Sequence, residues 1–165
     1  MAALAFSWTL QGAGWALVSA ADDHADVDVI ASYSAGTDAA AHFLYTLARL
    51  TLTDTQAEVA FDAERKVYRW FFRRDGSAVD IWVVAADDHQ APAESGGVLW
   101  SSRQSLDTLS RTVIRAFDRV AYDWGEDGYQ LEWRRPFPRN ELEGLRTAWR
   151  GLRAGMQGVK DRGPH

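Results

Sequence analysis

The sequence predicts a single α+β domain, an antiparallel β-sheet with two or three amphipathic helices packed on one face. Three observations favour this class: several segments alternate between apolar and polar residues, a strong hairpin signal lies between two of them, and other segments have apolar residues at helical spacing. The predicted order is β-β-β-α-β-β-β-β-α-α. At 165 residues the chain has the length of one domain. We expect a domain over residues 1–154 and a flexible tail over residues 155–165.

The first third of the chain predicts three strands and a helix. Residues 4–10 alternate, a glycine-rich loop follows, and residues 15–20 are apolar, a pattern typical of a β-hairpin. Residues 27–33 predict a third, half-buried strand. Thr37 or Asp38 can cap a helix that runs to about Leu50. Its apolar stripe consists of Ala40, Phe43, Leu44, Leu47 and Leu50.

Two tight hairpins are predicted over residues 57–86. Asp75-Gly76 is a strong two-residue turn signal, and taking it as the turn pairs Phe72 with Val79, Trp70 with Ile81 and Tyr68 with Val83. A turn near Glu64-Arg65 pairs Phe61 with Tyr68 and Val59 with Trp70. Both registers place the large apolar side chains on one face, which is expected to be the core.

The opposite face of these strands presents Arg69, Phe71, Arg73, Asp80 and Trp82. The predicted register places Trp82 opposite Arg69 and diagonal to Phe71. An exposed aromatic side chain beside arginine is typical of a protein-binding hot spot. The alternative is that another element covers Trp82, or that Arg69 only stacks on its ring. We treat these five residues as candidates for binding a protein partner.

The last third predicts one short strand and two helices. Residues 91–97 are expected to be a loop and residues 98–102 a strand. Ser105 caps a long helix with Trp124 on its inward face, and Gly125 ends it. Residues 126–138 are expected to be turn-like, with aromatics that plug one end of the sheet. The last helix starts near Asn140, with Leu142, Leu145, Trp149 and Leu152 inward and Arg146, Arg150 and Arg153 outward.

Two other kinds of site are compatible with these elements. Tyr68, Trp70, Tyr122 and Trp124 could line a small-molecule or enzymatic pocket between the sheet and the long helix. The pentapeptide Ala-Ala-Asp-Asp-His occurs at residues 20–24 and 85–89, which suggests an internal duplication. Its polar residues, Asp22, Asp23, His24, Asp87, Asp88 and His89, are possible ligands of a divalent metal. The simpler interpretation is two solvated loops whose aspartates accept backbone hydrogen bonds.

Composition limits the remaining classes of function. The net charge of −5 argues against a nucleic-acid binder. Without cysteine there is no thiol chemistry or disulfide, and we identify no nucleophile motif and no cofactor fingerprint. The apolar opening segment has no basic residues, so we expect no signal peptide and no membrane span. The prediction is a cytoplasmic, non-enzymatic domain that binds an unknown protein partner and resembles an immunity protein in role; the oligomeric state is not predicted.

Overall fold

The structure is a computed structural model that describes residues 3–33, 37–87, 97–161 and 163. Its ten elements follow the predicted order: β1 Ala5–Gly12, β2 Trp15–Ala21, β3 Asp26–Ser32, α1 Ala39–Leu52, β4 Gln56–Asp62, β5 Val67–Asp75, β6 Ala78–Ala86, β7 Gly97–Ser105, α2 Leu106–Trp133 and α3 Arg139–Asp161. The predicted α+β class is therefore confirmed. None of the helices in this part of the chain is both long and apolar enough to cross a membrane.

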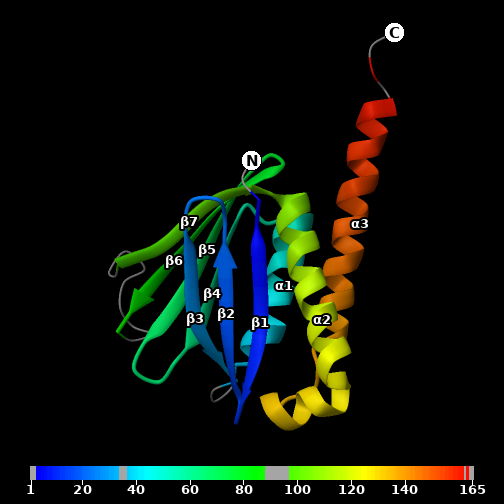
Figure 1. Ribbon diagram of the computed structural model, residues 1–165. Helices are drawn as coiled ribbons and strands as arrows, with labels where there is room; N and C mark the ends of the chain where they lie inside the picture. Colours follow the sequence, from blue (N-terminus) through cyan, green and yellow to red (C-terminus); the bar gives the residue numbers. More distant parts are fainter. Residues whose placement is uncertain (1–2, 34–36, 88–96, 162, 164–165) are drawn as a thin grey trace.

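The seven strands form two antiparallel sheets, whereas the sequence pattern predicted one antiparallel sheet. One sheet has the order β1-β2-β3 and the other β4-β5-β6-β7. Side-chain hydrogen bonds join the two sheets near both ends of β3. The Trp100 indole donates to the Ala25 carbonyl at 3.2 Å, and the Ser32 hydroxyl donates to the Asp62 carbonyl at 2.7 Å. The helices gather on one side of the strands, and α3 extends beyond the other elements (Figure 1).

The core lies between the inner faces of the sheets and helices α1 and α2. It is strongly aromatic, with buried rings from β1, β4, β5, β7, α1 and α2. Trp8 of β1 packs against Phe61 of β4 and Phe117 of α2, with ring centroids 5.8 Å and 5.1 Å apart. Phe43 of α1 lies 5.5 Å from Trp70 of β5. The predicted stripe of α1 is entirely buried, and Asp38 is its N-cap, accepting from the backbone N–H groups of residues 40 and 41.

The register of the central hairpin differs from the prediction by two residues. Phe72 pairs with Ile81 and Trp70 with Val83, so the core face is preserved while every partner shifts. The two central turn residues are Gly76 and Ser77, with Gly76 at φ +59°, as in turns that place glycine first. Tertiary contacts fix this choice, since the Ser77 carbonyl accepts from the backbone of the first residue of α2 at 2.8 Å. The predicted β4–β5 register is confirmed.

The segment predicted to be turn-like is mostly helical. Helical geometry in α2 is interrupted at Gly125, whose φ of 68° and ψ of 161° suit glycine, and it resumes to Trp133. Tyr129 and Trp133 are spaced four residues apart and are both fully buried, so this short helical segment packs onto the core. The aromatics therefore close one end of the sheets, as expected. The break at Gly125 also corrects the placement of Trp124, which is 43% exposed rather than inward.

Helix α3 packs through Leu142 and Leu145, which are buried as predicted. Arg146 was expected to point outward, but only 18% of its side chain is exposed because it forms ion pairs with α2. The helix continues to Asp161, so most of the segment predicted to be a tail is helical. The Ala-Ala pair of the first pentapeptide copy ends β2, and that of the second copy ends β6. Each of these strands is the second of the three strands that come directly before a helix. That arrangement fits the duplication hypothesis, which stays a prediction.

Candidate binding surface on the outer face of the four-stranded sheet

The strand register brings two aromatic rings together on the outer face of β5 and β6. Phe71 lies directly opposite Trp82, and their rings stack with centroids 5.3 Å apart and an interplanar angle of 14°. Both side chains are partly exposed. The predicted partner of Trp82 was Arg69; the two-residue shift makes it Phe71 instead. We name Phe71, Arg73, Asp80, Trp82 and Arg103 the outer-face cluster.

Arginines surround this aromatic pair. The guanidinium carbon of Arg73 lies 5.6 Å from the centroid of the Trp82 ring, within the range of a cation–π contact. Arg103 of β7 donates to both carboxylate oxygens of Asp80 at 3.0 Å and to Asp75 at 2.9 Å. Arg69 differs from the others, because 7% of its side chain is exposed and it pairs with Glu58 at 3.7 Å. Arg69 is thus a buried neighbour of the cluster, and Arg103 is a member that sequence reasoning missed.

Two shallow hollows flank Trp82, and its ring lines both. One, of about 320 Å³, lies on the β4 side and is lined by Gln56, Ala57, Glu58, Phe71, Phe72, Arg73 and Trp82. The other, of about 570 Å³, lies on the β7 side and reaches the β2–β3 turn; it is lined by Asp22, His24, Asp80, Ile81, Trp82, Val98, Ser101, Ser102 and Arg103. A partly exposed aromatic pair between two hollows is a surface that side chains of another protein can pack against.

The first Asp-Asp-His loop is held by hydrogen bonds within the protein. The Asp22 carboxylate accepts from the backbone N–H groups of His24 and Ala25, both at 2.9 Å, and from the Ser102 hydroxyl at 2.7 Å. The Ser102 hydrogen bond is the main reason that the pKa of Asp22 lies below its ordinary value. This agrees with the interpretation of a loop whose aspartate satisfies backbone donors.

The second loop is only partly within the described residues. Asp87 is exposed, and Asp88 and His89 lie outside the described residues. Within the described ranges, no three acidic or histidine side chains are grouped so that they could hold a metal ion. A metal site shared by the two loops therefore stays a prediction.

The four residues predicted to line a pocket do not come together. Trp70 is 2% exposed within the core and Tyr68 is partly buried beside it, whereas Tyr122 is 87% exposed on α2. Trp124 lines a separate hollow between β1 and α2. Tyr122 lies outside the buried stripe of α2, and Trp124 faces the hollow beside β1.

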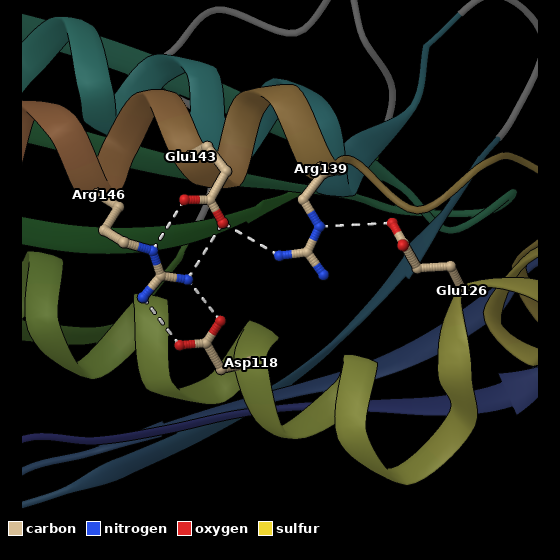
Figure 2. A network of polar contacts seen from close by, with 5 residues as sticks. All are labelled: Asp118, Glu126, Arg139, Glu143 and Arg146. Carbon is tan, nitrogen blue, oxygen red and sulfur yellow. Dashed lines mark hydrogen bonds and ion pairs between the residues drawn. The ribbon is translucent and has the colours of Figure 1, made fainter.

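A network of ion pairs joins α3 to both halves of α2 (Figure 2). Arg146 donates to the two carboxylate oxygens of Asp118 at 2.6 and 3.0 Å and to Glu143 at 3.0 Å. Arg139 bridges Glu143 at 3.1 Å and Glu126 at 3.4 Å, on the far side of the Gly125 break. Hydrogen bonding to Arg146 lowers the pKa of Glu143. Because an arginine pairs with each carboxylate, we infer that this network fixes the angle between the two halves of α2 at Gly125.

No protein-family model and no curated protein matches the sequence. Among solved structures the chain is similar to one from a CdiA-CT/CdiI toxin and immunity complex from Enterobacter cloacae, at 9% identity and a TM-score of 0.46, covering 68% of this chain and 99% of that one. A likeness at this level carries no argument about function.

Proposed function

We propose that this chain is a non-enzymatic protein-binding domain and that its partner docks on the outer-face cluster. The observation that carries the proposal is the stacked, partly exposed pair Phe71 and Trp82 with Arg73 above the indole. Aromatic and arginine side chains contribute most of the binding energy in protein interfaces, and an apolar patch rimmed by polar residues often marks an interaction site.

The charges around the cluster indicate what kind of surface the partner presents. The hollow on the β7 side reaches the β2–β3 turn, which carries Asp22 and Asp23, whereas Asp80 in the same hollow is already paired with Arg103. The chain as a whole has a net charge of −5. We therefore expect the partner to place an apolar group against Trp82 and basic groups toward the β2–β3 turn, as electrostatic complementarity requires.

The finer proposal is a role like that of an immunity protein, in which binding neutralises or scaffolds the partner. A stable complex of this kind buries about 1,600 Å² in total. The aromatic pair Phe71 and Trp82 and the two hollows beside it would form the centre of such an interface, and the paired charges Asp80, Arg103 and Asp75 would lie at its polar rim.

The test is affinity capture from the native lysate followed by mass spectrometry, repeated with two variants. Trp82→Ala removes the proposed anchor, and Tyr45→Ala removes an exposed aromatic side chain on α1, far from the cluster in sequence and on another element. We expect a stoichiometric protein that is captured by the wild type and by Tyr45→Ala but lost with Trp82→Ala. Titration calorimetry with the purified partner then measures the loss of affinity, about thirtyfold or more for an anchor residue.

Two outcomes would contradict the proposal. Capture of the partner by Trp82→Ala at wild-type yield would place the interface elsewhere. Recovery of a small molecule in place of a protein would favour the alternative of a ligand-binding domain.

A further inference from the structure

A second surface, independent of the outer-face cluster, lies along the edge of the three-stranded sheet. β1 is an edge strand, and among the described strands it pairs with β2 alone. A hollow of about 530 Å³ is lined by every residue from Leu4 to Thr9. Successive side chains of a strand point to opposite faces, so a hollow lined by six consecutive residues follows the edge of the strand and not one face. Unpaired backbone groups at such an edge can accept another strand.

Helix α2 forms the other wall of this groove. The two elements lie side by side and run in the same direction (Figure 1). The α2 residues that line the groove are Thr112, Arg115, Ala116, Arg119, Val120, Asp123 and Trp124. Grooves between an edge strand and a helix bind extended peptides in several domain families, with the backbone giving affinity and alternate side chains giving specificity.

The groove is basic, although the chain as a whole is acidic. Arg115 is exposed and forms no ion pair within the described part of the chain. Arg119 is 77% exposed and pairs at 3.1 Å with Asp123, the one acidic residue among the described residues that line the groove. The charge of Arg115 thus remains uncompensated, and a carboxylate from a ligand could compete with Asp123 for Arg119.

The spacing of the two arginines matches that of a strand. Four residues of helix rise about 6 Å, and side chains two residues apart on one face of a strand lie about 6.6 Å apart. We propose that this groove binds an extended acidic peptide segment of another protein, added as a strand to the edge of β1, with carboxylates at alternate residues on Arg115 and Arg119. A second copy of this chain is a poorer occupant, because pairing two β1 edges would bring the arginines of both copies to one interface.

The test measures fluorescence anisotropy of a labelled peptide that alternates valine and glutamate, added to the purified full chain. Two control peptides replace glutamate with lysine, or carry N-methyl groups on alternate backbone nitrogens so that they cannot add to a strand edge. Arg115→Gln removes the unpaired charge and keeps a good helix former. Arg150→Gln, exposed on α3 and outside the groove, is the matched control.

We expect the acidic peptide to bind and both control peptides to bind at least tenfold more weakly. Arg115→Gln should weaken binding of the acidic peptide about tenfold or more, and Arg150→Gln should leave it unchanged. Backbone amide NMR signals of residues 4–9 should shift during the titration, which a nonspecific ionic contact with α2 would not cause. Equal affinity for the lysine peptide, or no effect of Arg115→Gln, would overturn the proposal. Tighter binding of a single-stranded oligonucleotide, or a dimer of the free chain disrupted by the peptide, would assign the groove to another occupant.

Discussion

Replacing each of two tryptophans on opposite faces of the central hairpin tests the fold and the proposed surface together. Trp70 is 2% exposed and its ring lies within 5.5 to 6.3 Å of the rings of Phe43, Phe61 and Phe6. Truncating such a residue to alanine costs about 3–5 kcal/mol, because it leaves a cavity among rings that cannot collapse into it. For a chain of this size each kcal/mol lowers the melting temperature by about 2–4 °C.

Trp82→Ala should cost far less, because the residue is only half-buried. It loses one stacked aromatic contact, about 0.5–1.5 kcal/mol, and one exposed cation–π contact, about 0.5–1 kcal/mol. We therefore expect Trp82→Ala to cost about 1–2.5 kcal/mol. A protein that remains folded is what the capture experiment requires.

Trp70→Phe separates cavity formation from polar burial. The indole N–H of Trp70 is buried without a hydrogen-bond partner in the described part of the structure. Phenylalanine removes this unsatisfied donor and keeps most of the ring, so the two effects partly cancel and Trp70→Phe should cost under about 1.5 kcal/mol.

The assay is urea denaturation followed by far-UV circular dichroism, since tryptophan fluorescence changes with the substitutions themselves. The expected order of destabilisation is Trp70→Ala first, Trp82→Ala second and Trp70→Phe last or equal to it. Equal destabilisation by Trp70→Ala and Trp82→Ala would show that Trp82 also belongs to the core. The argument for a binding surface would then fail.

Two further predictions concern single carboxylates. Asp38 caps α1, and it also accepts a hydrogen bond from the Trp133 indole at 3.0 Å. Asp38→Ala should therefore cost about 2–4 kcal/mol in urea denaturation, the sum of a lost cap and an unpaired buried donor, while Asp38→Asn should cost less. Equal costs for the two variants would show that the cap does not contribute. The lowered pKa of Asp22 means that its contribution to stability is present above the ordinary carboxyl pKa of about 4 and is lost as the pH falls through the folded value. In an NMR titration Ser102→Ala should move that pKa back toward the ordinary value, and an unchanged pKa would refute the assigned cause.

Local patterns in the sequence determined the class, the order of elements and the division of each strand into two faces. Alternation placed Trp70 inward and Trp82 outward, and both placements hold whichever residues form the turn, because a shift of two residues preserves the face. Ser105 could be identified as a helix cap, and Asp38 as one of two candidates with Thr37, because a cap bonds to residues two or three positions away.

Contacts between distant segments decided the rest. The pairing of Phe71 with Trp82 depends on the turn at Gly76, which is held by a bond from α2, and Arg103 joins the cluster only because β7 pairs with β6. The helical segment after Gly125 was missed because its glycines suggested a turn, while burial of Tyr129 and Trp133 against the core stabilises a helix there. The groove beside β1 exists because α2 packs along a strand more than a hundred residues earlier in the chain, a proximity that no local periodicity encodes.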